Sequence, residues 1–124
     1  MPQRPFRQIA GKRGEDLACA ELQRRGYAIL ARRYRSRLGE IDIVCDDNGT
    51  IAFVEVKART SARRGSAAES ITWWKRRRIA AIALDYLART NTLTRRCRFD
   101  VVAIDGFGTG DQQLRVIKDA FVVE

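Results

Sequence analysis

Two runs of alternating apolar and charged residues, separated by a tight-turn sequence, form the clearest pattern in the chain. The runs cover residues 39–45 and 50–57, and β-branched residues are frequent in both. Between them, Asn48 and Gly49 are typical of the central residues of a type I′ turn. The pattern therefore predicts a β-hairpin.

The length of the turn decides which residues of the hairpin face each other. A two-residue turn sets Asp42 opposite Glu55 and Glu40 opposite Lys57. Side chains alternate between the faces of a strand, so Asp42, Glu55 and Lys57 should share one face. The other face would carry four apolar residues: Ile41, Ile43, Val54 and Val56. A three-residue turn would shift the register by one and separate the two carboxylates.

A carboxylate pair on neighbouring strands suggests a cation between them. Like charges placed directly opposite each other destabilise a strand pair. Mg²⁺ takes carboxylate and carbonyl oxygens together with water. We therefore expect Asp42, Glu55 and the carbonyl of Val56 to be metal ligands. Lys57 would point its ammonium at the anion that the metal holds.

The rest of the chain predicts two helices and three further strands. One helix is expected over residues 11–25, with Gly26 as a left-handed C-cap, and a longer one over residues 67–89. The further strands are expected at 27–34, 98–104 and 114–122. Residues 1–10 contain both prolines and are expected to form a loose basic arm. The order of helix, three strands, helix and two strands predicts one α/β domain with a mixed β-sheet flanked by helices.

Charged residues interrupt the apolar stripes of both predicted helices. Glu15 lies in phase with the apolar residues of the first helix, although a first-turn acidic residue favoured by the helix dipole is the alternative. On the second helix, Lys75 and Arg78 lie in phase with Trp74 and several isoleucines. Trp73 lies on the opposite side, so this helix would be covered on two sides or contact a partner.

The composition points to an anionic partner. The net charge is +9, and it comes mostly from arginine, because lysine occurs only at positions 12, 57, 75 and 118. The planar guanidinium group suits phosphate, which indicates a nucleic acid. A protein that is merely basic is the alternative. Histidine is absent, which excludes histidine bases, triads and metal ligands.

Cysteine usage and hydropathy indicate a cytoplasmic protein. Cys19, Cys45 and Cys97 are far apart and lie in apolar patterns, so we expect buried free thiols in a reducing compartment and no zinc site. No apolar run approaches the length needed to span a bilayer, and the N-terminus lacks a signal-peptide core. No association with a membrane is expected.

The order of these motifs resembles a known nuclease superfamily. Asp42 followed by Glu55-Val56-Lys57 resembles the PD-(D/E)XK motif of restriction-endonuclease-like proteins, with Ile41 where the motif name puts proline. The wider pattern resembles the small YraN-like bacterial family within that superfamily. It consists of Gly11-x-x-Gly14-Glu15, Gly39-Glu40-Ile41-Asp42, Phe53-Val54-Glu55-Val56-Lys57-x-Arg59 and Arg98-Phe99-Asp100.

This resemblance implies a restriction-endonuclease-like fold and a set of site residues. They are Glu15, Asp42, Glu55 and Lys57, in the manner of archaeal Holliday-junction resolvases. Those enzymes cut branched DNA as dimers with Mg²⁺ or Mn²⁺, so the same metals, branched DNA and a homodimer are implied here. Asp100 matches a family position, for which a structural role is expected.

Together these observations predict a metal-dependent DNA endonuclease. Lys57 and Lys75 would orient the attacking hydroxide or stabilise the transition state. Six arginines near the charged strand ends would hold flanking phosphates: Arg35, Arg37, Arg59, Arg63, Arg64 and Arg78. Two alternatives remain open: a nucleic-acid-binding repair accessory protein that cleaves little, and a scaffold that binds another protein through Trp73 and Trp74.

Overall fold

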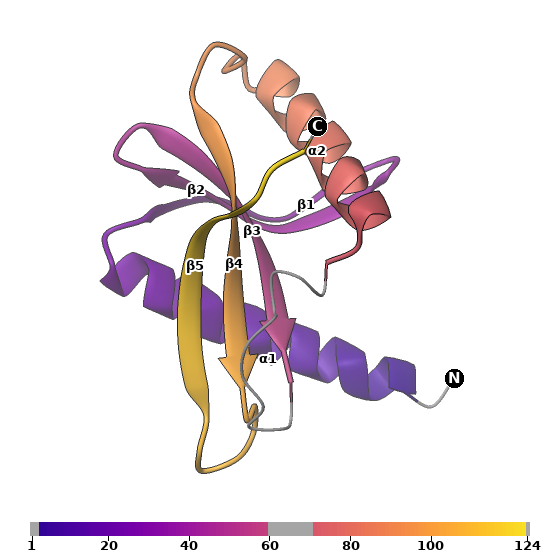
Figure 1. The fold of residues 1–124 in the computed structure, drawn as a ribbon, viewed down its shortest axis with the longest axis vertical. Helices are drawn as coiled ribbons and strands as arrows, with labels where there is room; N and C mark the ends of the chain where they lie inside the picture. The colour runs from indigo at the N-terminus through magenta and orange to yellow at the C-terminus, as the bar shows by residue number, and fades with distance from the viewer. Residues whose placement is uncertain (1–2, 60–70, 124) are drawn as a thin grey trace.

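The computed structural model describes the backbone of residues 3–59 and 71–123, and the side chains of residues 11–59 and 71–123. Two helices and five strands follow one another in the predicted order of helix, three strands, helix and two strands (Figure 1). Their bounds are α1 Gln3–Arg24, β1 Ala28–Ser36, β2 Gly39–Asp47, β3 Thr50–Ala58, α2 Trp73–Arg89, β4 Cys97–Asp105 and β5 Gln113–Phe121.

The five strands form one open sheet in the order β1-β2-β3-β4-β5. All neighbours are antiparallel except β3 and β4, which are parallel. Parallel neighbours need a long crossover, and the chain between β3 and β4 contains α2. The prediction of an α/β fold with a mixed sheet flanked by helices is confirmed, and the arrangement is consistent with the restriction-endonuclease-like fold.

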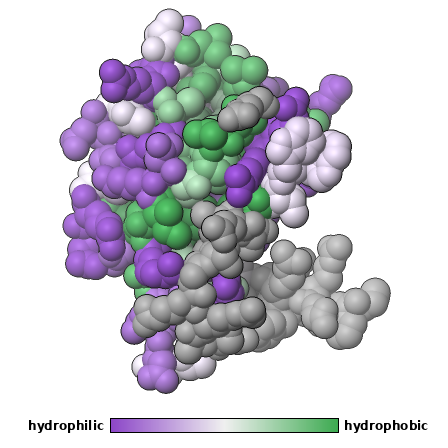
Figure 2. Space-filling view, viewed as in Figure 1, coloured by the Kyte–Doolittle hydropathy of each residue, from purple (hydrophilic) through white to green (hydrophobic). Residues whose placement is uncertain are grey.

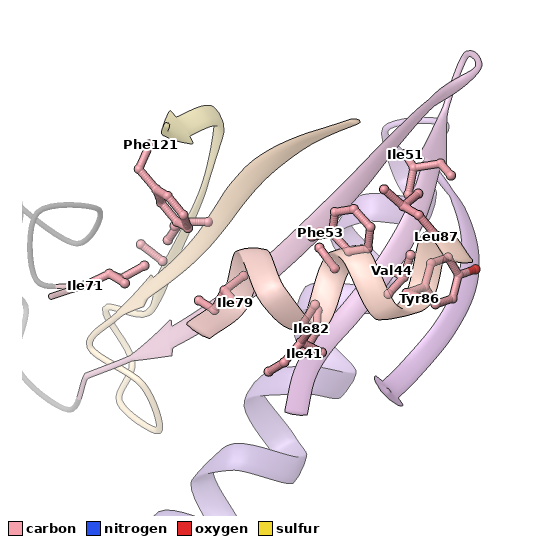
Figure 3. Packing of buried hydrophobic residues seen from close by; sticks show 13 residues of the cluster. Ile41, Val44, Ile51, Phe53, Ile71, Ile79, Ile82, Tyr86, Leu87 and Phe121 are labelled. Atoms are coloured by element: carbon pink, nitrogen blue, oxygen red, sulfur yellow. The ribbon is translucent and has the colours of Figure 1, made fainter. Parts of the chain in front are cut away.

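Each helix covers one face of the sheet. Successive strand residues point to opposite faces, so Phe53 packs in the cluster that contains α2, whereas Val54 packs in the cluster that contains α1. Leu22 of α1 is fully buried in its cluster. Figure 3 shows Ile82 and Tyr86 of α2 among the strand residues that they cover. The sheet is therefore the middle of three layers.

The predicted hairpin register is confirmed from Asp47 to Ile43 of β2, whereas the predicted pairs Asp42–Glu55 and Glu40–Lys57 are not part of the recorded ladder. Asp47 pairs with Thr50, and the ladder continues to Ile43↔Val54. Asn48 and Gly49 have φ angles of 52° and 96°, as a type I′ turn requires. Ile41 is a correction: it packs in the α2 cluster and not with Ile43 on the α1 side. It lies beyond the last recorded pair of the β2–β3 ladder, where alternation imposed by this pairing need not continue.

The helix ends differ partly from the sequence-based expectation. Helix α1 begins at Gln3, so the backbone of residues 3–10 is helical where a loose arm was expected. Pro5 lies in the first turn, where its missing N–H breaks no helical hydrogen bond. Gly26 has a φ angle of 95° and follows the helix as the predicted left-handed residue. Helix α2 begins at Trp73, because the Thr72 side chain accepts a hydrogen bond from the Lys75 N–H and caps it.

Two expectations about burial were wrong. Cys97 is exposed, whereas Cys19 and Cys45 are buried free thiols as expected. Trp74 is 72% exposed, although its phase along α2 matches the buried isoleucines. Cys97 is the first residue of β4 and Trp74 the second of α2, so both lie at the end of an element, where burial follows the periodic pattern less closely.

Hydrophilic side chains cover much of the face seen in Figure 2, with hydrophobic surface between them near the top of the molecule. Exposed large apolar residues near the C-terminal half of α2 include Leu84 and Leu93. None of the helices described here is long and apolar enough to cross a membrane.

Candidate functional site

The β2–β3 ladder ends directly before the two acidic residues Asp42 and Glu55. The last recorded backbone pair is Ile43↔Val54. At the next residue of β2, a side chain replaces the backbone as the hydrogen-bond acceptor: Asp42 Oδ2 accepts a hydrogen bond of 2.8 Å from the Val56 N–H. The N–H and C=O of one residue point to the same side of an extended strand. The Val56 carbonyl therefore points towards β2, the strand that carries Asp42.

The opened strand ends border a pocket of about 300 Å³. Strands β2 and β3 supply Asp42, Glu55, Val56 and Lys57, and α2 supplies Lys75. The structure thus brings together all three predicted metal ligands and both lysines proposed to act near them.

The pocket holds two carboxylates with incomplete compensation. Glu55 is 8% exposed, and its Oε2 lies 2.6 Å from the Lys75 Nζ. Burial, followed by the nearby charge of Glu55, raises the pKa of Asp42 to about 7, while the Val56 N–H and Lys75 oppose the increase. A carboxyl whose charged form is this costly favours a cation beside it.

The donor set suits a hard divalent ion. Among the side chains of residues 11–59 and 71–123, no group of three or more His, Cys, Asp or Glu could hold a metal. Asp42 and Glu55 supply two carboxylates to the pocket, and the Val56 carbonyl would be a third oxygen donor. Mg²⁺ keeps several waters and is commonly bound through one or two carboxylates, so these residues fit Mg²⁺ or Mn²⁺ better than zinc.

Glu15 lies next to the pocket without lining it. Its buried carboxylate bonds to two consecutive residues of β1: Arg32 Nη2 lies 2.8 Å and Arg33 Nε 3.2 Å from its oxygens. Consecutive strand residues normally point to opposite faces. Arg33 has a φ angle of 52°, a left-handed conformation that is uncommon for arginine, and both arginines reach Glu15. The charge of Glu15 still contributes to the raised pKa of Asp42.

The four predicted DNA-binding arginines within the described residues are dispersed. Arg35 is paired with Glu40 at 2.5 Å, and Arg37 lies at the β1–β2 turn beside Asp85 and Arg89. Arg59 directly follows β3, two residues beyond Lys57, and the exposed Arg78 lies one turn after Lys75 on α2. Arg63 and Arg64, together with most of the loop expected beside the strand ends, lie outside the described residues.

Two small residues of the pocket were not among the predicted site residues. Gly11 and Ala58 line it beside the acidic pair. No heavy atom lies within 4 Å of a Cβ built on Gly11, so a larger side chain there would project into open space near the pocket. The signal was available, because Gly11 begins the Gly-x-x-Gly-Glu pattern, but the resemblance assigned a site role only to Glu15 of that pattern.

Sequence comparisons identify relatives that match almost the whole chain. It is similar to a protein of Symbiobacterium thermophilum named "UPF0102 protein STH1475", 43% identical over 111 residues, which are 90% of this chain and 94% of the relative. A Ralstonia nicotianae relative, "UPF0102 protein RSc3265", is 46% identical over 127 residues, 99% and 94% of the two chains. A Ralstonia pickettii relative, named only "UPF0102 protein", is 44% identical over 124 residues, 97% and 95%.

The model of one family also matches most of the chain. It covers residues 14–104, a span that includes Glu15, the whole β2–β3 hairpin, α2 and nearly all of β4. The acidic pair and both lysines of the pocket therefore lie inside the matched region. The chain belongs to the family described as "Uncharacterised protein family UPF0102".

Proposed function

We propose that this protein is a metal-dependent endonuclease that hydrolyses DNA phosphodiester bonds. The observation that supports this most is the meeting of Asp42 and Glu55 in one pocket together with Lys57 and Lys75. A protein that only bound phosphate would gain from losing negative charge near its groove. The PD-(D/E)XK-like order of Asp42 and Glu55-Val56-Lys57 agrees with the same reaction.

The residues of the pocket would divide the work. Asp42, Glu55 and the Val56 carbonyl would hold Mg²⁺ or Mn²⁺, which when bound activates water and polarises the phosphoryl oxygen. Lys57 would hold the attacking water or the phosphate in place. Lys75 would leave Glu55 and move its ammonium towards the phosphate.

The proposed substrate is branched or otherwise structured DNA, cut by a homodimer. This part depends on the resemblance to Holliday-junction resolvases and on the charge of +9. Arg59 and Arg78 flank the pocket in the chain and would contact neighbouring phosphates, with the salt dependence expected for such contacts. Arg35, Arg37, Arg63 and Arg64 are proposed for more distant phosphates.

One observation favours a second candidate, a nucleic-acid-binding accessory protein with little cleavage. Glu55 is already neutralised by Lys75 at 2.6 Å. If that ion pair persists in the presence of metal, Asp42 is the one remaining carboxylate lining the pocket, and a divalent ion would bind weakly.

Cleavage assays with several DNA structures test the proposal. Purified protein would be incubated with a four-way junction, a flap, single-stranded DNA and linear duplex, each with Mg²⁺, Mn²⁺ or EDTA. We expect metal-dependent nicking, strongest on the branched substrates. Asp42→Asn, Glu55→Gln and Lys57→Ala should each reduce the rate about a hundredfold or more, because several kcal/mol of transition-state stabilisation depend on this site.

The matched control is Asp111→Asn. Asp111 is an exposed carboxylate in the β4–β5 loop, and Asp111→Asn makes the same chemical substitution as Asp42→Asn outside the pocket. The control should cut like the native protein. The contrary result would be that the native protein and all three pocket variants bind branched DNA equally well and that no substrate is cut. The protein would then be the accessory protein and not an endonuclease.

A further inference from the structure

The start of α2 exposes both tryptophans of the chain. Trp73 is 55% and Trp74 72% exposed, and the chain contains no others. Their ring centroids lie 4.6 Å apart, with an angle of 81° between the ring planes. Large aromatic side chains usually lie inside a protein or in an interface. Two exposed tryptophans in one helical turn therefore indicate a contact surface.

The surroundings of the tryptophan pair are cationic. The next four residues are Lys75, Arg76, Arg77 and Arg78, and the first turn of α2 contains no acidic residue. The Arg77 guanidinium carbon lies 5.0 Å from the centre of the Trp73 ring. Beside it is a hollow of about 220 Å³, lined by Trp73, Arg76, Arg77, Val122 and Val123.

These features favour one kind of partner. A second copy of the chain, docked symmetrically through the tryptophans, would bring the two runs of four cations towards each other, which is costly for like charges. An anionic partner with flat aromatic faces satisfies both the charges and the rings. Unpaired nucleobases on a phosphate backbone have this chemistry, because every base offers a π face and every phosphate a charge.

The position along the helix connects the tryptophans to the candidate site. Lys75 follows Trp74 directly, and its Nζ lies 2.6 Å from Glu55. A base stacked on Trp74 would thus be held next to the residues that face the scissile phosphate.

We propose that Trp73 and Trp74 form a stacking platform for unpaired bases, so that the substrate is DNA with a single-stranded segment beside the cleaved phosphate. The proposal rests on the proposed nucleic-acid function and narrows its substrate class. Binding by the platform requires neither metal nor cleavage.

Tryptophan fluorescence, excited selectively over the three tyrosines, reports on this platform, because both tryptophans of the chain belong to it. The full-length protein in EDTA would be titrated with a thymidine oligonucleotide and with an abasic strand of the same length, at one salt concentration. We expect the thymidine strand to quench the fluorescence and to bind about tenfold or more tightly than the abasic strand. The abasic strand has the same phosphates, so the difference measures stacking.

Variants separate stacking from charge and from folding. Trp74→Ala should bind the thymidine strand about tenfold more weakly, whereas Trp74→Phe, which keeps an aromatic face, should retain most of the affinity. Leu84→Ala, at a residue 58% exposed on the same helix, is the control and should bind like the native protein. Circular dichroism of each variant shows that the fold is kept.

Two results would overturn the platform. Equal binding of the thymidine and abasic strands would show that phosphate charge alone explains the affinity. Self-association that Trp74→Ala abolishes, with no quenching by either strand, would make the tryptophans a protein interface. Failure of the endonuclease looks different: the thymidine strand would bind and quench as expected, but no DNA would be cut with metal present.

Discussion

Two regions of the sheet hold acidic residues in opposite ways. Near the hairpin turn, on the α1 side, Asp100 is fully buried, and both of its oxygens accept hydrogen bonds from Arg98. Near the opened strand ends, Asp42 and Glu55 line one pocket, and Lys75 of α2 forms an ion pair with Glu55. We call the first group, with Tyr27, Asp47 and Lys118, the hairpin network, and Asp42 with Glu55 the pocket pair.

The pKa shifts express this difference. Arg98, then Lys118, lowers the pKa of Asp47 against the opposing effect of burial. In the pocket pair, burial and Glu55 raise the pKa of Asp42. A buried acid that the protein itself neutralises contributes to the fold, whereas one left under-compensated favours a ligand. The contrast is therefore a physical argument that the pocket of Asp42 and Glu55, and not the hairpin network, favours a ligand.

Disrupting the hairpin network should have the largest effect on the free energy of unfolding. Asp100→Ala would leave the largely buried Arg98 with only Asp47 as an acidic partner and the Asp119 N–H without its acceptor. Breaking one partner of a buried ion pair costs about 3 kcal/mol or more. Urea denaturation should show a decrease of that size in the free energy of unfolding. The exposed Asp111→Ala should change it by less than about 0.5 kcal/mol, and a similar loss in both variants would contradict the comparison.

Metal should stabilise the protein through the pocket pair and not through the hairpin network. Mn²⁺ at a hundred times its dissociation constant stabilises the folded state by about 2.7 kcal/mol, which corresponds to a rise in melting temperature of several degrees for a chain of this size. Glu55→Gln should abolish this rise, measured by differential scanning fluorimetry, while Asp111→Asn should keep it. An equal rise in Glu55→Gln would mean that the ion binds elsewhere.

Asp42→Asn should stabilise the protein when no metal is present. The folded state raises the Asp42 pKa from 3.8 to about 7. The folded protein therefore keeps a proton between these pH values that the unfolded chain has lost, and stability decreases as the pH rises through this range. Asparagine carries no charge and can still accept the Val56 hydrogen bond, so at pH 8 in EDTA we expect a gain of about 1 kcal/mol or more.

The pH dependence provides the check on that variant. At pH 4 the native carboxyl is protonated when folded, and the two proteins should have nearly equal free energies of unfolding in urea. A variant less stable than the native protein at pH 8 would show that the Asp42 charge is well compensated, and the contrast with the hairpin network would disappear.

Local sequence signals were enough for the fold and for the hairpin register near its turn. Asn48 and Gly49 determine the turn, and the turn determines the pairing as far as Ile43 and Val54. Beyond that pair the alternation on β2 breaks, since Ile41 and Ile43 pack on opposite faces. Element order followed from hydrophobic periodicity in the same way. These features depend on neighbours in sequence, which a single chain reveals.

What could not be predicted depends on distant contacts or on rare backbone conformations. Arg33 adopts a left-handed φ angle, and no residue pattern indicated that it would join Arg32 in binding Glu15. The exposure of Trp74 depends on where the layer beneath α2 ends, which helical phase does not reveal. The ion pair between Lys75 and Glu55 joins residues twenty positions apart and required the packing of α2 on the sheet.

The smallest expected effect on stability concerns Tyr27 of the hairpin network. The Tyr27 hydroxyl donates to Asp100 at 3.3 Å and accepts from Arg98 at 3.0 Å. Tyr27→Phe removes both hydrogen bonds but leaves the Arg98–Asp100 ion pair, so we expect a loss of about 1 kcal/mol in urea denaturation. Burial, then Asp100, raises the Tyr27 pKa to about 12. The hydroxyl therefore stays protonated, and the loss should be the same at pH 6 and pH 9. Asp42→Asn is the contrasting variant, because its gain in the free energy of unfolding should increase with pH over part of this range. If the loss of stability in Tyr27→Phe also changed with pH, the hairpin network would titrate like the pocket pair.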